Sequence, residues 1–143
     1  MASERLEEFA RTLVAAVRDA AIRNCDMNLR PDARNPIAKR WRAERGDPET
    51  FGAMLAADCV DATICALLRA LDQGMLRLDY RAEDGTRIDL TDDGEGRGER
   101  VGWYMGGPDG WRSHSRERVF DDLTDLYPVP ESPAGTPAPP RSR

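Results

Sequence analysis

The stretch DPETFGAMLAADCVDATICALLRALDQG, residues Asp47 to Gly74, has the clearest helix boundaries and the densest apolar patterning in the chain. Asp47 is a good N-cap, and Pro48 suits the first helical position because an N–H there would have no helical partner. Gly74 is typical of the residue that follows a helix. Apolar residues cover a wide face of this helix, at Ala53, Ala57, Val60, Ile64, Leu67, Leu68 and Leu71. Residues 48–73 are therefore predicted to form a central helix, sandwiched between other elements.

Two further helices are predicted before it. Residues 3–24 repeat apolar side chains at three-four spacing, and Ser3 is a suitable N-cap. Residues 25–36 contain two prolines and several turn-forming residues, which predicts a loop. Residues 37–45 then form a short helix, with Trp41 on its inner side and a basic outer face of Lys39, Arg40 and Arg42 that is expected to be solvated.

After Gly74 the hydrophobic period changes from 3.6 to 2, which indicates strands. Three are predicted, at residues 75–81, 86–91 and 100–105, with a turn at Glu83-Asp84-Gly85. Three successive strands favour an antiparallel meander with the helices packed on its apolar face. The predicted fold class is therefore α+β.

The C-terminal part of the chain is predicted to contain one more helix and a tail. Residues 115–126 show helical spacing of apolar residues. Residues 128–143 are rich in proline and contain too few apolar residues to offset the entropy of ordering them, so a disordered tail is expected. Residues 1–127 would then form a single domain.

Composition restricts the function classes. The 143 residues are 40% hydrophobic and 33% charged, which is typical of a soluble globular protein. A formal charge of −5 disfavours nucleic acid and favours a basic protein partner. The N-terminal residues lack the apolar run of a signal peptide, so a cytoplasmic location without membrane contact is expected. Three cysteines without CxxC spacing argue against both a disulfide framework and a zinc site, and no cofactor is predicted.

Asp58 and Asp61 lie three residues apart on one side of the central helix, where two carboxylates could hold a cation or act as acid and base. This DxxD spacing resembles the carboxylate helices of all-α nucleotide pyrophosphohydrolases. The resemblance implies further carboxylates on a facing helix, which Glu4, Glu7 and Glu8 would have to supply. A solvated acidic edge, or one paired with Arg69, is the commoner arrangement and is the favoured interpretation. No metal site is therefore predicted, although Asp58 and Asp61 remain candidates.

The segment TDDGEGRGE, residues Thr91 to Glu99, is glycine-rich and acidic, but two familiar motifs do not fit it. As a calcium loop starting at Asp89, it has Arg100 where a closing glutamate is required. As a phosphate loop, it has Glu99 in place of the third glycine. A flexible connection is expected, with an acidic contact loop for a basic partner as the alternative.

Several aromatic residues follow this loop. Trp103, Tyr104 and Trp111 either close the core or form a contact surface of the kind that interface hot spots use. In the second case, the predicted partner-binding residues are Asp92, Asp93, Glu95, Glu99, Trp103, Tyr104 and Trp111.

The leading functional hypothesis is a small cytosolic module that binds a basic protein, as an inhibitor or immunity protein does. One alternative is a small enzyme or ligand-binding domain, with or without metal, whose pocket lies between the central helix and the sheet. It would use Asp58, Asp61 and the single histidine, His114. No nucleophile signature accompanies His114, so an enzyme is less favoured. A homodimer that pairs exposed strand edges is a third hypothesis.

Overall fold

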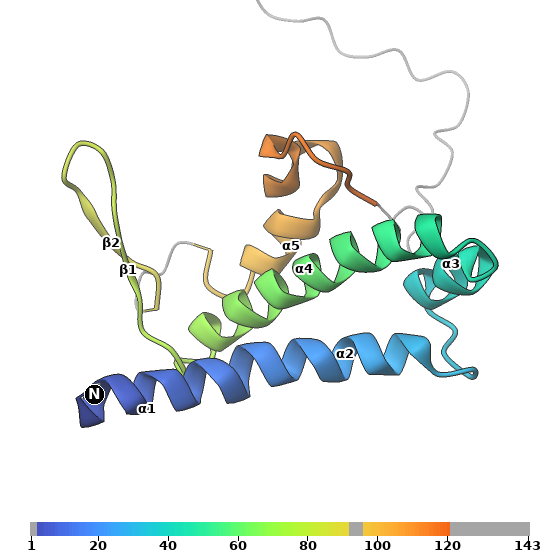
Figure 1. Ribbon diagram of the computed structural model, residues 1–143. Coiled ribbons are helices and arrows are strands. Elements are labelled where there is room, and N and C mark those ends of the chain that lie inside the picture. The colour runs from blue at the N-terminus through green and yellow to red at the C-terminus, as the bar shows by residue number, and fades with distance from the viewer. Residues whose placement is uncertain (1–2, 92–95, 121–143) are drawn as a thin grey trace, which may run out of the picture.

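The computed structural model describes residues 3–91 and 96–120. Its elements, in chain order, are α1 (Glu4–Leu13), the π-helical turn η1 (Val14–Arg18), α2 (Asp19–Leu29), α3 (Pro36–Glu44), α4 (Pro48–Asp72), β1 (Asp79–Arg81), β2 (Arg87–Asp89), α5 (Arg100–Met105) and the 3-10 turns η2 (Gly107–Asp109) and η3 (Trp111–His114). The elements α1, η1 and α2 form one continuous N-terminal rod. This rod lies along one side of α4, and α5 lies on the other (Figure 1). The prediction of a sandwiched central helix is thus confirmed.

The boundaries of α4 are those that its sequence predicts. The Asp47 side chain accepts hydrogen bonds from the backbone N–H groups of Glu49 and Thr50, at 3.2 and 3.4 Å. The Thr50 hydroxyl also donates to Asp47, and this bond, followed by those from the backbone, lowers the pKa of Asp47. At the other end, Gly74 has φ +69°, a left-handed conformation that glycine adopts without a steric penalty.

The first helix is longer than predicted. The elements α1, η1 and α2 follow one another without a break to Leu29, so the prediction of a loop from Cys25 is wrong for residues 25–29. Asn28 is buried, and its side-chain oxygen accepts a 2.7 Å hydrogen bond from Asn35, which ties the last turn of α2 to the start of α3. The chain becomes extended only at Arg30, the residue before a proline, as the steric demand of proline requires.

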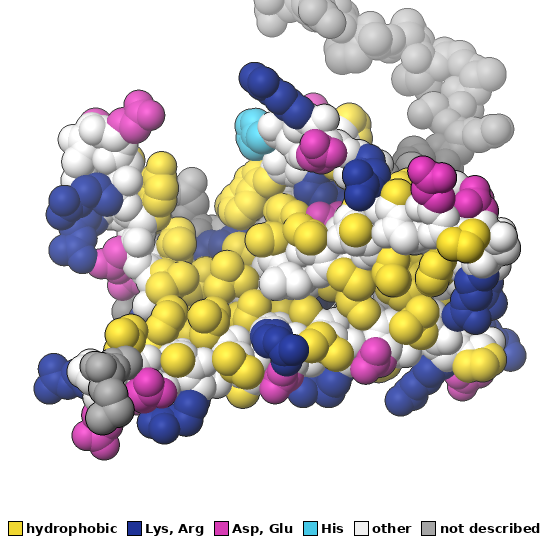
Figure 2. Space-filling model, in the orientation of Figure 1, with side chains coloured by type: hydrophobic (Ala, Val, Ile, Leu, Met, Phe, Trp, Pro, Cys, Tyr) yellow, Lys and Arg dark blue, Asp and Glu magenta, His cyan; other side chains and the backbone are white. Residues whose placement is uncertain are grey.

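Two groups of buried side chains form the core. Between the N-terminal rod and α4, small residues let the two backbones approach closely; the group comprises Val17, Ala21, Ala66, Ala70, Leu71 and Leu76. Around α3, Trp41 is completely buried and meets Phe51 edge-on, with ring centroids 6.4 Å apart. Leu6 and Phe9 of the predicted apolar stripe lie outside the core and are exposed. Figure 2 shows hydrophobic side chains along the seam between the rod and α4.

The hairpin is confirmed, but the meander is not. Strands β1 and β2 pair antiparallel with Tyr80 opposite Ile88, and the turn places Gly85 at φ +86°. Both strands are only three residues long, and the hairpin projects away from the helices (Figure 1). The prediction that the helices pack on a sheet is therefore wrong. In the described residues, the core lies between helices, and the hairpin packs on it only at its base.

Residues 100–105 form helix α5, so the predicted third strand is wrong. The alternation of RVGWYM suits a strand, yet its first residue, Arg100, is buried and bonds to the Asp72 carboxylate at 3.3 Å and to the carbonyl of Leu90. The N–H of Arg100 donates a 3.1 Å hydrogen bond to the carbonyl of Gly96. A helical turn, rather than pairing with a strand, therefore satisfies the backbone hydrogen bonds here. The fold class is α+β, with two strands in the part of the chain that the structure describes.

The predicted C-terminal helix does not begin at residue 115, because residues 115–120 are not helical. Its remaining residues, and the predicted tail at 128–143, lie outside the described residues. By length and hydropathy, α4 is also apolar enough to cross a membrane, a test that the core helix of a soluble protein passes as well. Three of its acidic side chains, Asp58, Asp61 and Asp72, meet arginines of other elements.

Candidate functional site

Three carboxylates of α4 each meet an arginine from a different part of the chain. Asp58 pairs with Arg40 of α3 at 2.8 Å, Asp61 with Arg112 of η3 at 2.9 Å, and Asp72 with Arg100 of α5 at 3.3 Å. We call these three pairs the ionic row. Because the arginines come from three elements, the row fixes α3, α5 and η3 on the surface of α4.

Asp58 is buried, and both of its carboxylate oxygens accept hydrogen bonds. The guanidinium of Arg40 donates to both carboxylate oxygens, at 2.8 and 3.2 Å, and the indole N–H of Trp41 donates to one of them at 2.5 Å. Such a two-pronged arrangement is the strongest form of this interaction. The guanidinium also stacks over the ring of Phe120, 4.4 Å from its centroid. The expectation of a solvated acidic edge is thus wrong for Asp58.

Asp61 binds two side chains from the C-terminal part of the described chain. The Tyr104 hydroxyl donates to one of its oxygens at 2.7 Å, and Arg112 donates to the other. Arg112 also donates to the carbonyls of Met105 and Phe120, both at 3.0 Å, while its buried Nε has no hydrogen-bond partner. Burial, followed by the bond to Asp61, raises the pKa of Tyr104 well above its ordinary value.

This arrangement does not favour a metal ion. Both candidate carboxylates, Asp58 and Asp61, are neutralised by arginine, and the groups that face them are guanidinium, indole and phenol rather than further carboxylates. Among the described residues, there is no group of three acidic, histidine or cysteine side chains that could hold a metal. The likeness to pyrophosphohydrolase carboxylate helices therefore ends at the DxxD spacing.

A small cavity of about 140 Å³, with a mainly apolar lining, lies beside the ionic row. Its walls come from α2, α3, α4, α5, η3 and residue 120, and include Asp58, Asp61, Cys65 and Arg112. The predicted pocket between the central helix and the sheet is therefore not where the cavity lies. His114 is exposed and does not line it.

Outside the ionic row, two indole rings form an exposed pair. Trp103 and Trp111 lie with ring centroids 5.9 Å apart, tilted by 58°, and are 39% and 41% exposed. We call them the tryptophan pair. Beside Trp111 is an open hollow of about 360 Å³, which is also lined by Val60 and Val119, both exposed. This corner combines aromatic and aliphatic surface in contact with solvent.

Gly96 fits closely beneath the tryptophan pair. A Cβ at Gly96 would overlap the ring of Trp103, and the residue has φ +73°. Both facts require glycine at this position. One glycine of the predicted flexible connection thus sets the position of an exposed indole.

The structure brings together only part of the predicted contact surface. Trp103 and Trp111 are adjacent and exposed, whereas Tyr104 turns inward to Asp61. Glu99 is exposed just before α5, and Asp92, Asp93 and Glu95 lie outside the described residues. Sequence reasoning did not identify Arg40, Arg100 or Arg112 as partners. The available signal was a pair of acids on an otherwise apolar helix, because a carboxylate in such a place requires a counter-charge.

Two cysteines that sequence reasoning treated as separate are in contact. Cys25 of α2 donates a hydrogen bond to Cys59 of α4, with 3.0 Å between the sulfurs, and both are half-buried. Burial, then the bond to Cys59, raises the pKa of Cys25 from 9.0 to about 12. The third cysteine, Cys65, is buried.

Comparison with known proteins gives this chain no family: no family model matches it, and neither a curated protein nor a solved structure matches it significantly.

Proposed function

We propose that this protein is a protein-binding module whose contact surface is the tryptophan pair together with the adjacent hollow. The observation that carries the proposal is the exposure of two neighbouring indoles on a buried ionic support. Tryptophan is strongly enriched among the residues that dominate binding energies. Two indoles that remain in water in the isolated chain can release that water when a partner covers them.

The support beneath the pair makes this surface rigid. Arg112 follows Trp111 directly and joins α4, α5 and residue 120 through its hydrogen bonds. Tyr104 follows Trp103 directly and is held by Asp61. Each exposed indole is thus the neighbour of a side chain anchored on α4. A surface ordered in advance loses little conformational entropy on binding, which favours affinity.

The charge of the partner is a separate question. Among the described residues 96–120, which carry the tryptophan pair, the exposed charges are balanced, with Arg97, Arg116 and Arg118 against Glu99, Asp109 and Glu117. The preference for a basic partner therefore comes from the charge of −5 on the whole chain. We therefore propose that the partner is a basic protein, which an acidic inhibitor or immunity protein with an aromatic contact surface could bind.

The test is capture of a defined partner. The full chain and its Trp103→Ala and Trp111→Ala variants are immobilised and offered the purified products of the neighbouring genes. Tyr80→Ala is the control, since Tyr80 is an aromatic residue on the hairpin that is even more exposed than the two tryptophans. The proposal expects binding to fall at least about tenfold for each tryptophan variant and to be unchanged for the control.

Two results would contradict it. One is binding that both tryptophan variants retain in full. The other is a wild-type chain that captures nothing and remains monomeric in light scattering at low salt. A stable dimer that the tryptophan substitutions leave intact would favour the homodimer hypothesis. Strands of three residues, however, offer few hydrogen bonds for edge pairing.

The cavity beside the ionic row supports a second candidate function, the binding of a small ligand. Its lining includes Arg112, whose buried Nε lacks a hydrogen-bond partner, and such a donor is normally satisfied. A thermal-shift panel of divalent metals and small anions separates the two functions. A rise in the melting temperature that disappears in Asp61→Asn favours the ligand site, and the absence of any rise favours the binding module.

A further inference from the structure

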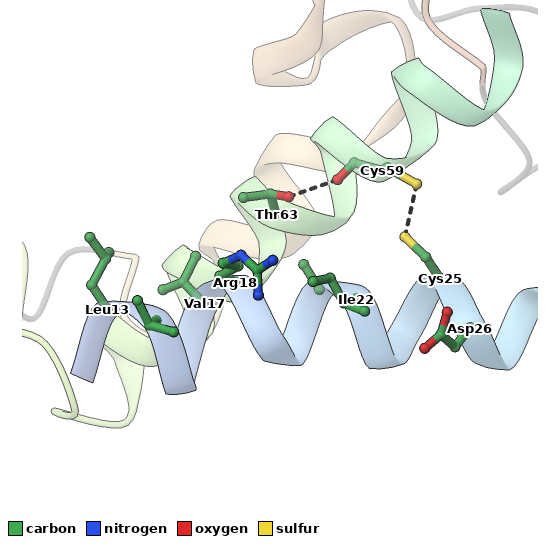
Figure 3. A pocket seen from close by; sticks show the side chains of 10 residues that line it. Leu13, Val17, Arg18, Ile22, Cys25, Asp26, Cys59 and Thr63 are labelled. Carbon is green, nitrogen blue, oxygen red and sulfur yellow. Dashed lines mark hydrogen bonds between the residues drawn. The ribbon is translucent and has the colours of Figure 1, made fainter. Parts of the chain in front are cut away.

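Cys25 and Cys59 lie 34 residues apart in sequence and face one another across the boundary between α2 and α4 (Figure 3). Their sulfurs are 3.0 Å apart, so a covalent bond requires them to approach by only about 1 Å. The helices that carry them already pack through the apolar core on one side of this contact. The backbone therefore holds the two thiols in position before any bond forms.

The pair is also accessible to a reagent. Both cysteines are half-buried and line an open groove of about 460 Å³. The wall of the groove is mainly apolar, with Val17 and Ile22 on one side and Thr63 on the other. Cys65 differs in both respects, because it is buried and does not line this groove. Two of the three cysteines are thus distinguished by position.

We propose that Cys25 and Cys59 form an intramolecular disulfide when the protein meets a low-molecular-weight disulfide such as oxidised glutathione. One cysteine, as its thiolate, attacks a sulfur of the reagent, forming a mixed disulfide and releasing one small thiol. The second cysteine loses its proton and attacks the cysteine sulfur of the mixed disulfide, releasing the second small thiol. Two cysteine thiols are oxidised, one reagent disulfide is reduced, and both protons leave with the small thiols.

The environment sets the character of this reaction. Burial raises the pKa of Cys25 from 9.0 to about 12, which reduces the fraction of reactive thiolate at neutral pH. Fast redox sensors instead use thiols with a lowered pKa. The exchange is therefore slow and serves to join α2 to α4. The inference does not rest on the proposed binding function, because the tryptophan pair lies on other elements.

The test uses the full chain, first fully reduced and then incubated with oxidised glutathione. Remaining thiols are counted by maleimide tagging of the denatured protein, and the bond is mapped with a protease that cleaves before aspartate. Cleavage before Asp61 separates Cys59 from Cys65, which a trypsin digest would leave in one peptide. The expected product is a monomer with one remaining thiol, Cys65, and a linked pair of peptides containing Cys25 and Cys59.

Variants provide the controls. Cys65→Ser should form the same bond, whereas Cys25→Ser and Cys59→Ser should instead accumulate the mixed disulfide with glutathione. Three remaining thiols in the wild-type protein would overturn the proposal. So would a linked peptide containing Cys65, or a covalent dimer. Because the thiol count and the peptide map are made on the wild-type chain, they decide the matter even if a variant fails to fold.

Discussion

The hydroxyl of Tyr104 donates a 2.7 Å hydrogen bond to the carboxylate of Asp61, 43 residues earlier in the chain. Arg112 donates a hydrogen bond to the other oxygen of the same carboxylate. These bonds join α5 and η3 to the central helix through buried or half-buried polar groups, and they leave the neighbouring indoles exposed. The residues that bond to Asp61, Tyr104 and Arg112, thus directly follow the two exposed tryptophans in the chain.

The tryptophan pair should contribute little to stability compared with the buried tryptophan. Trp111→Ala should lower the free energy of unfolding by no more than about 1 kcal/mol, as for a surface substitution. Trp41 is completely buried and bonded to Asp58, so Trp41→Ala should cost about 3–5 kcal/mol. Urea denaturation followed by circular dichroism measures both. Equal losses would show that the tryptophan pair belongs to the core.

Gly96 should control the position of Trp103. In Gly96→Ala the new methyl group overlaps the indole, so the ring must move and the emission spectrum of tryptophan should shift. Gly98→Ala is a matched control, because Gly98 has a similar φ of +82° but no atom within 4 Å of its added Cβ. Both variants should lose about 1–2 kcal/mol from backbone strain. A spectral shift in both, or in neither, would contradict this account.

The Asp58–Arg40 pair should be far more important for stability than an exposed pair. Asp58→Ala removes the acceptor for both Arg40 and the Trp41 indole, and should cost about 3–5 kcal/mol. Asp19→Ala breaks the exposed Arg18–Asp19 pair and should cost less than about 1 kcal/mol. A double-mutant cycle of Asp58→Ala with Arg40→Ala should show strong coupling, with the double variant costing less than the sum. Simple additivity would contradict a direct interaction.

Stability should fall at alkaline pH. The pKa of Cys25 is raised from 9.0 to about 12 in the native state, and that of Tyr104 is raised above 10.0. Between the unfolded-state and the native-state pKa of each group, the unfolded chain binds fewer protons than the native chain. The free energy of unfolding therefore decreases as pH rises. The contribution of Cys25 is complete below pH 9 and is lost towards pH 12. Urea denaturation from about pH 8 to pH 11 measures this slope.

Two variants assign the slope to its groups. Cys25→Ser and Tyr104→Phe each remove one group with a raised pKa, so each should show a shallower loss of stability with pH than the wild type. Such a comparison concerns the slope alone, since each substitution also removes a hydrogen bond and lowers stability at every pH. A wild-type chain whose stability does not change over this range would contradict the predicted direction.

Oxidation of the cysteine pair should stabilise the fold. A bond that closes a loop of this length stabilises by up to about 4 kcal/mol in the chain-entropy description. The melting temperature of the oxidised wild-type protein should therefore rise by several degrees over that of the reduced protein. Differential scanning calorimetry with and without a phosphine reductant measures the difference. Cys25→Ser should show none, and a lower melting temperature on oxidation of the wild type would indicate strain at the linked position.

Short-range chemistry explains what could be predicted. Asp47, Pro48 and Gly74 set the ends of α4 through bonds and dihedral angles within a few residues of each end, and these depend little on the rest of the chain. The hairpin turn at Gly85 is equally local. Both features were therefore correct from the sequence. Sequence patterns were misleading where a side-chain contact overrode them. One example is the hydrogen bond from Asn35 to Asn28, which holds the last turn of α2 in helical form.

The sequence by itself thus determined the central helix, its ends and the hairpin, because their hydrogen bonds close locally. Only the tertiary structure decided that residues 100–105 are helical, that Asp58 is buried and that Cys25 meets Cys59. Each of these depends on a contact between segments far apart in sequence, such as Arg100 with Asp72 or Arg40 with Asp58. A buried charge takes the conformation that reaches its counter-charge, and alternation within six residues carries no information about where that counter-charge lies.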